Sequence, residues 1–181
     1  QLEQLKIPIS YGYSTHTIPD NSDLVIIGNS LSRGNPVIEK ILKENINFTS
    51  GPAWLGETVL GDRKRIVVSG THGKTTVSSL ITWILTENGY RPGFLIGGIP
   101  GNFEYSASIG ESDLFVVEGD EYDSAFFDKR SKFIHYRPDL LVINNLEHDH
   151  VDIYANLSEI ITQFHHMIRT MSSSALIIRP E

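Results

Sequence analysis

A glycine-rich segment between an apolar run and an amphipathic run is the feature that most limits what this chain can fold into. The apolar run covers residues 66–68, the segment reads SGTHGKTT over residues 69–76, and a helical pattern follows over residues 77–88. A glycine-rich turn from a buried strand into a helix directs backbone N–H groups and the positive end of the helix dipole to one place, which favours phosphate. The segment therefore predicts an α/β fold with a phosphate-binding loop.

Two side chains of this loop fit the chemistry of a nucleoside triphosphate. Lys74 can place a positive charge against the outer phosphates, and the hydroxyl of Thr75 can hold Mg²⁺. The general pattern has a glycine five residues before Gly73, where this chain has Val68, so the loop is the shorter form G-T-x-G-K-T-T. The alternative is an ordinary strand-to-helix turn with an exposed lysine. The residues predicted to bind ATP in the loop are Gly70, Thr71, His72, Gly73, Lys74, Thr75 and Thr76.

Composition argues against several classes of partner. The 181 residues are 40% hydrophobic, enough for one domain or for one domain and part of another. The net charge is −7, from 15 basic and 22 acidic residues, so we expect neither nucleic acid nor an anionic membrane as the main partner. The absence of cysteine excludes disulfide and thiol chemistry. No apolar run reaches the roughly 20 residues of a membrane span, so insertion into a membrane is not expected.

The ends of the chain predict a fragment and a cytoplasmic location. The sequence begins at Gln1 without an initiator methionine and stops just after an apparent strand near residue 178. We therefore expect missing parts on both sides. No signal peptide is visible at the start, and cytoplasm is then the expected compartment.

Strand and helix patterns alternate along the chain, which predicts α/β units with mainly parallel sheets. The first unit, residues 1–60, begins with the continuous apolar strand 24–28, which we expect to be buried on both faces. Asn35 and Pro36 are typical of the start of a helix, here ending near residue 44. A strand at 46–49 and a short helix at 52–60 complete this unit.

The second unit, residues 61–181, follows a linker at 61–64. Asn156 and Glu159 form a capping-box pattern, which predicts the start of the last helix. The strands expected in this unit are 65–68, 94–96, 114–117, 140–143 and 175–178.

Two of these strands end in residues that suit a metal and phosphate site. Strand 114–117 is followed by EGDEYD (118–123), and strand 140–143 by NNLEHDHVD (144–152). Ligands bind at the carboxyl ends of strands in open α/β sheets, and Mg²⁺ prefers oxygen ligands. A solvated acidic loop is the alternative, and the nearby phosphate loop favours the metal site. We assign no zinc site, because there is no cysteine and no helical histidine pair four residues apart.

The three stretches together resemble the ATP-site motifs of the Mur ligase family, the ATP-dependent amide-forming enzymes of peptidoglycan synthesis. His72 is similar to the branch that uses UDP-N-acetylmuramate. The runs GGIPGNF (97–103) and FFDKRSKFIHYRP (126–138) are similar to members that add the murein tripeptide L-alanyl-γ-D-glutamyl-meso-diaminopimelate. The resemblance covers essentially the whole chain. It implies part of a Rossmann-like UDP-sugar-binding domain at 1–60 and part of a P-loop ATPase-type domain at 61–181, with the acceptor-binding C-terminal domain absent.

The resemblance also implies roles for single residues. Lys74, Glu118 and His150 would be catalytic, with Lys74 on the β- and γ-phosphates. Thr75 and Glu118 would hold the Mg²⁺ that bridges these phosphates, and His150 would hold a second Mg²⁺. Asn145 would contact ATP. The substrate would be bound by His72, Asn102, Ser30 and Arg33.

The implied reaction is an ATP-dependent ligation through an acyl phosphate, with UDP-N-acetylmuramate and the tripeptide as substrates. The sequence leaves three alternatives open. The first is a ligase that adds L-alanine to UDP-N-acetylmuramate. The second is a general P-loop NTPase or kinase, and the third is an inactive nucleotide-binding fragment. Oligomeric state does not follow from the sequence.

Overall fold

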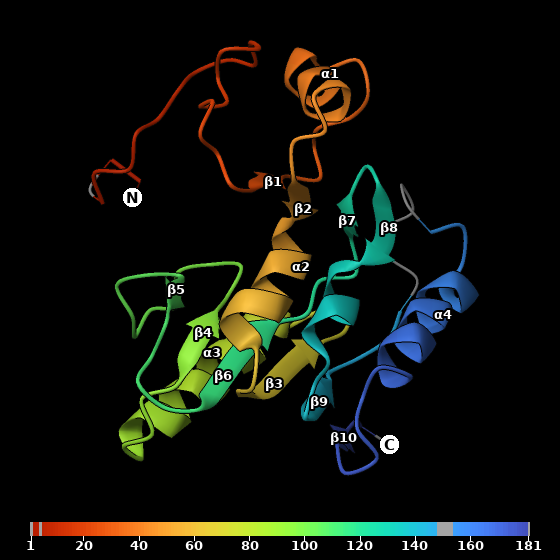
Figure 1. The fold of residues 1–181 in the computed structure, drawn as a ribbon. Coiled ribbons are helices and arrows are strands. Elements are labelled where there is room, and N and C mark those ends of the chain that lie inside the picture. Colours follow the sequence, from red (N-terminus) through yellow and green to blue (C-terminus); the bar gives the residue numbers. More distant parts are fainter. Residues whose placement is uncertain (1, 4, 148–153, 181) are drawn as a thin grey trace.

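The computed structural model describes residues 2–3, 5–147 and 154–180. Over these ranges the strands form one six-stranded sheet and two small two-stranded sheets (Figure 1). The first part of the chain contains β1 (Val25–Ile27), α1 (Pro36–Lys43), β2 (Phe48–Ser50), α2 (Gly51–Trp54) and the π-helix η1 (Leu55–Leu60).

The larger part of the chain is built around the six-stranded sheet. The sheet contains β3 (Lys64–Ser69), β4 (Gly93–Leu95), β5 (Ala107–Ser108), β6 (Leu114–Glu118), β9 (Leu140–Ile143) and β10 (Leu176–Ile178). Its two long helices are α3 (Lys74–Glu87) and α4 (Leu157–Ile168). A hairpin, β7 (Asp123–Ala125) and β8 (Asp128–Ser131), and the 3₁₀ helix η2 (Lys132–Tyr136) connect β6 to β9.

The strand order of the large sheet is β10-β9-β3-β6-β4-β5. All neighbouring pairs are parallel except β4 and β5, which confirms the mainly parallel sheet. Strand β3 lies between β6 and β9, and all three run in the same direction. The carboxyl ends of β3, β6 and β9, which precede the three motifs found in the sequence, are therefore immediate neighbours along one edge of the sheet.

Alternating residues of the central strands face two separate cores. Val67 and Val117 belong to the cluster that includes Phe164 of α4. Ile66 and Val116 belong to the opposite cluster, against which the α3 side chains Ile81 and Leu85 pack. This alternation is the period of two that a β-strand imposes, and it explains why β3 reads as a continuous apolar run: both of its faces are covered.

Strand β1 corrects one expectation. It pairs with β2 in parallel, but Ile26 is 47% exposed while Ile27 is 2% exposed. The run 24–28 is thus buried on one face over the described residues, not on both. The reason is that α1 covers one side of this two-stranded sheet and contributes Val37 and Ile38 to the same small core as Ile27.

Helix boundaries follow the predicted caps, with two differences. The Asn35 side chain accepts the N–H of Val37 at 3.0 Å, and the Asn156 side chain accepts the N–H of Glu159 at 3.2 Å. Helix α3 begins at Lys74, three residues before the apolar pattern that predicted it. The predicted helix 52–60 changes to a π-helix from Leu55, with the N–H of Gly61 bonded to the carbonyl five residues earlier.

Some elements have no counterpart in the predicted set, namely β5, the β7–β8 hairpin and η2. Among the residues that the structure describes, no helix is long and apolar enough to cross a membrane.

Candidate functional site

The phosphate loop connects β3 to α3 and contains two positions that only glycine can occupy. Gly70 has φ +128°, and a Cβ there would lie 2.7 Å from the Asn145 carbonyl oxygen. Gly73 has φ +77°, and a Cβ there would lie 2.6 Å from Nδ2 of Asn144. Positive φ and close approach both require a residue without a side chain. The loop is therefore shaped against the chain that follows β9.

Hydrogen bonds from that chain fix the loop backbone. The N–H of Thr71 donates to the Asn145 carbonyl at 3.1 Å, and the N–H of His72 donates to Oδ1 of Asn145 at 2.8 Å. Nδ2 of Asn144 donates to the His72 carbonyl at 2.7 Å. Asn144 was not among the predicted site residues. Its position directly after strand 140–143, before Asn145, is the signal that could have identified it.

Lys74 lies at the start of α3 with its ammonium turned toward protein oxygens. Its Nζ donates to the carbonyls of Gly70 at 2.7 Å and Thr71 at 3.2 Å. It also lies 3.2 Å from the carboxylate of Glu121, whose side chain is 3% exposed. The sequence predicted Lys74 at this place but assigned no role to Glu121.

The structure brings the side chains of Thr75 and Glu118 together. The Thr75 hydroxyl lies 3.0 Å from both carboxylate oxygens of Glu118. The N–H of Gly97, from the loop after β4, donates to Oε2 of Glu118 at 2.8 Å. The carboxylate at the end of β6 is thus positioned by the first turn of α3 and by the neighbouring loop.

The acidic loop 118–123 is held from the other side by the β7–β8 hairpin and η2. Lys132 Nζ donates to Oδ2 of Asp120 at 2.6 Å. The Tyr154 hydroxyl donates to the Glu121 carbonyl at 2.5 Å and lies 2.9 Å from Oγ of Ser131. Burial raises the pKa of Tyr154, which keeps its hydroxyl protonated as a donor.

The oxygen atoms of this site fit a magnesium ion. Thr75 supplies a hydroxyl and Glu118 a carboxylate, both hard oxygen ligands beside the phosphate loop. The predicted ligand His150 lies outside the described residues. Within the described ranges, no group of three or more His, Asp or Glu side chains gathers as a self-sufficient metal centre.

The residues predicted to bind substrate occupy different places. Arg33 forms a two-point ion pair with Glu39, at 2.9 and 3.1 Å, in the exposed loop that also contains Ser30. His72 is exposed, and its Nε2 lies 3.8 Å from a carboxylate oxygen of Glu147. Asn102 is exposed, and the hydrogen bonds among the described residues do not include its side chain. The structure does not bring these four predicted residues into mutual contact.

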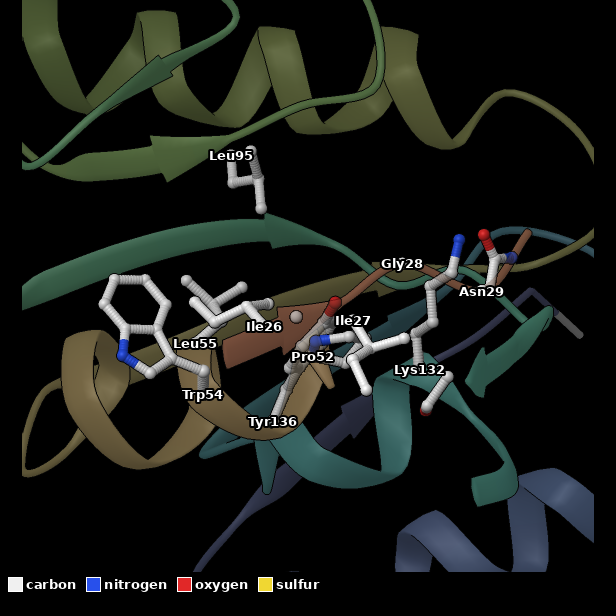
Figure 2. Close-up of a pocket in the computed structure, with 12 residues that line it drawn as sticks. Ile26, Ile27, Gly28, Asn29, Pro52, Trp54, Leu55, Leu95, Lys132 and Tyr136 are labelled. Carbon is white, nitrogen blue, oxygen red and sulfur yellow. The ribbon is translucent and has the colours of Figure 1, made fainter. Parts of the chain in front are cut away.

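A cleft of about 380 Å³ lies between the first part of the chain and the large sheet. Figure 2 shows its lining, with Ile26 to Asn29 on one side and Leu95 on another. Among the described residues that line the cleft, Lys132 is the one with a charged side chain. It belongs to η2, as does Tyr136. The lining residues are Ile26, Ile27, Gly28, Asn29, Gly51, Pro52, Trp54, Leu55, Leu95, Ser124, Lys132 and Tyr136.

Comparison with protein families assigns the region that contains this site. Residues 68–180 match the Mur ligase middle domain, which is more than half of the chain. The chain belongs to the Mur ligase family. The resemblance that the three strand-end motifs indicated is thereby confirmed.

Individual relatives refine the place of the chain within the family. It is 55% identical to a UDP-N-acetylmuramate–L-alanyl-γ-D-glutamyl-meso-2,6-diaminoheptandioate ligase of Escherichia coli (strain K12), over 99% of the chain and 39% of that protein. It is 32% identical to a UDP-N-acetylmuramate–L-alanine ligase of Lachnoclostridium phytofermentans, over 91% of the chain and 34% of that protein. The chain therefore spans well under half the length of these curated relatives.

A solved structure agrees with this placement. The crystal structure of a UDP-N-acetylmuramate:L-alanyl-γ-D-glutamyl-meso-diaminopimelate ligase from Neisseria meningitides superposes with a TM-score of 0.93 at 47% identity. The superposition covers 98% of this chain and 58% of the other. The α/β architecture described above is thus that of a Mur ligase.

Proposed function

We propose that the complete protein containing these residues is an ATP-dependent ligase of peptidoglycan recycling. It would join L-alanyl-γ-D-glutamyl-meso-diaminopimelate to UDP-N-acetylmuramate. The observation that carries the proposal is the contact between Thr75, which follows Lys74 in the first turn of α3, and Glu118 at the end of β6, the parallel neighbour of β3. The choice of acceptor is supported by the higher identity to the tripeptide-adding relative, 55% against 32% for the L-alanine-adding one.

The proposed reaction activates a carboxylate, which is a poor electrophile at neutral pH. Transfer of the γ-phosphoryl group of ATP to a carboxylate oxygen of the muramyl group gives an acyl phosphate and ADP. The amino group of the tripeptide then attacks the acyl carbon, and inorganic phosphate leaves as the amide forms. In phosphoryl transfer the protein contributes mainly positioning and charge stabilisation.

The residues of this chain would supply those contributions from fixed positions. Lys74 would neutralise charge on the β- and γ-phosphates. Bound Mg²⁺ would stabilise charge on the transferring group, and Thr75 and Glu118 would hold it, with His150 on a second ion. The proposed ATP contacts are Gly70, Thr71, His72, Gly73, Lys74, Thr75, Thr76 and Asn145.

The substrate would approach from the cleft shown in Figure 2, whose lining includes Gly28 and Asn29 after β1 and Lys132 of η2. We propose that His72 and Asn102 face the muramyl group and that Ser30 and Arg33 bind the UDP-sugar. On this view residues 1–60 are part of the UDP-sugar-binding domain and residues 61–181 part of the ATP-binding domain. Since the reaction consumes ATP, we place it in the bacterial cytoplasm.

Trapping with hydroxylamine tests the acyl phosphate. The complete protein, ATP, Mg²⁺ and UDP-N-acetylmuramate should give a muramyl hydroxamate that does not form when ATP is omitted. Hydrolysis of ATP without hydroxamate would instead identify a general P-loop NTPase or kinase.

Competition between acceptors tests the specificity. With equal concentrations of tripeptide and L-alanine, we expect the tripeptide product to dominate. Preferential formation of the L-alanine product would identify the other ligase of this branch. For the isolated 181-residue chain, the melting temperature with and without MgATP distinguishes a nucleotide-binding fragment from an inactive one.

A further inference from the structure

The Lys74 ammonium has its hydrogen-bonding capacity committed to protein atoms. Lysine offers three N–H donors and no acceptor. The three acceptors are the carbonyl oxygen of Gly70 at 2.7 Å, that of Thr71 at 3.2 Å and Oε1 of Glu121 at 3.2 Å. A phosphate oxygen can therefore bond to Lys74 only if it displaces one of these partners or shares a donor with it.

Glu121 differs from the two carbonyls because it carries a full negative charge. Its side chain is 3% exposed, and that of Lys74 is 13% exposed, so water screens their attraction poorly. A phosphate placed at Lys74 would bring more negative charge close to this buried carboxylate. Glu121 and the phosphate therefore compete for one cation and also repel each other.

The backbone that bears Glu121 is held in place on the side away from the phosphate loop. Tyr154 donates to the Glu121 carbonyl at 2.5 Å, and Ser131 lies 2.9 Å from the same hydroxyl. The Asp120 side chain, one residue earlier, bonds to Lys132 at 2.6 Å. Because the backbone is fixed at these points and the Glu121 side chain is only 3% exposed, its carboxylate has little room to withdraw from an arriving phosphate.

We infer that Glu121 is a positioning residue that holds the Lys74 ammonium against the phosphate loop and limits the affinity of the site for nucleotide phosphates. A carboxylate in this place holds the Lys74 ammonium beside the phosphate loop. It also lowers the affinity for a product that carries phosphate, so that the product can leave. The inference rests on the proposed binding of ATP by residues 70–76.

Calorimetric titration of the complete protein with ADP and with adenosine tests this inference. Glu121→Gln keeps the shape of the side chain but removes its charge, and we expect ADP to bind at least about fivefold more tightly. Adenosine should bind equally to both proteins because it has no phosphate. Asp113→Asn, just before the opposite end of β6, removes the same charge from an exposed carboxylate that lies 3.5 Å from Lys64 Nζ, and it should match the wild type.

The outcomes separate this inference from the proposed function. Wild-type protein that fails to bind ADP overturns the proposed function. Wild-type protein that binds ADP, with Glu121→Gln binding it equally or more weakly, overturns the role of Glu121. Equal tightening of adenosine and ADP would also overturn it, since that indicates a general change in the pocket. If Glu121→Gln does not fold, Glu121→Asp draws the carboxylate back from Lys74. Tighter ADP binding by that variant supports the inference, and unchanged binding contradicts it.

Discussion

The hydroxyl of Thr75 lies 3.0 Å from each carboxylate oxygen of Glu118, which connects the first turn of α3 to the end of β6. The N–H of Gly97, in the loop after β4, donates a hydrogen bond to the same carboxylate at 2.8 Å. These groups are more than twenty residues apart in sequence and meet because β3, β6 and β4 are neighbours in one sheet. The proposed magnesium position is therefore a property of the sheet as much as of the loop.

Glu118→Gln should greatly reduce ligase activity in the complete protein. The amide keeps the size of the side chain but is a much weaker ligand for Mg²⁺, so we expect kcat to fall by about 10²–10³, the range found for a lost charge-stabilising group. The Mg²⁺ concentration needed for half-maximal rate should rise. Initial rates over a Mg²⁺ titration measure both effects. Glu87→Gln, at the exposed end of α3, is the matched control and should behave as wild type. An unchanged Mg²⁺ requirement in Glu118→Gln would argue against its role as a ligand.

Lys74→Ala should abolish turnover and also lower stability. The substitution removes a cation 3.2 Å from a carboxylate that is 3% exposed, and breaking such a pair costs about 3 kcal/mol. Loss of activity alone is therefore ambiguous. The double variant Lys74→Ala, Glu121→Gln should regain part of the stability, measured by urea denaturation, yet remain inactive. Near-normal ligation by either variant would contradict the assignment of Lys74.

Gly73→Ala should be much more damaging than Gly89→Ala. The two glycines have nearly the same φ, +77° and +82°, so alanine suffers similar backbone strain at both, about 1 kcal/mol. At Gly73 the added Cβ would also lie 2.6 Å from Nδ2 of Asn144, whereas at Gly89 nothing lies within 4 Å. We expect only Gly73→Ala to disturb the loop and weaken ADP binding, as titration calorimetry would detect. Equal effects of the two substitutions on ADP binding would mean that the contact with Asn144 is unimportant.

The stability of the protein should fall on mild acidification partly because of His135. Burial lowers the pKa of His135 below its ordinary value of 6.5, although Asp128, 2.9 Å away, opposes the shift. In the unfolded chain His135 takes up its proton first as the pH falls. The contribution of neutral His135 to the stability is therefore fully present above pH 6.5, and it is lost as the pH falls from 6.5 through the folded-state pKa of His135.

The variant His135→Asn should accordingly show a smaller drop in melting temperature between about pH 7.5 and pH 5.5. His166→Asn, on the exposed face of α4, is the control and should keep the wild-type dependence. A wild-type dependence in His135→Asn would show that other groups cause the acid sensitivity.

The sequence allowed the arrangement of the strand ends to be predicted because parallel strands place their carboxyl ends at one edge of a sheet. Apolar runs indicated the positions of β3, β6 and β9. The segments that follow β6 and β9 do contact the phosphate loop and the start of α3 in the structure. The start of α3 was placed three residues late, since its first turn, beginning with Lys74, is polar and lies outside the apolar periodicity. His150 lies outside the described residues, so its role remains a proposal.

The β7–β8 hairpin could not be predicted from local rules. Its turn residues are Phe126 and Phe127, not the Asn-Gly or Asp-Gly pairs typical of two-residue turns. Ring packing takes their place: Phe127 meets Phe48 of β2 edge-on, with centroids 4.9 Å apart. The Lys74–Glu121 pair could not be predicted either, because the two residues are 47 positions apart and the local sequence around each does not indicate the contact.

The bonds that brace the phosphate loop also determine when it can form. His72 and Asn145 are separated by 73 residues, and Thr71 and Glu147 by 76. Closing such long segments is slow compared with forming the local turns of a helix. During synthesis the loop emerges from the ribosome well before its braces do. The braced form of the nucleotide site is therefore complete only after β9 has joined the sheet.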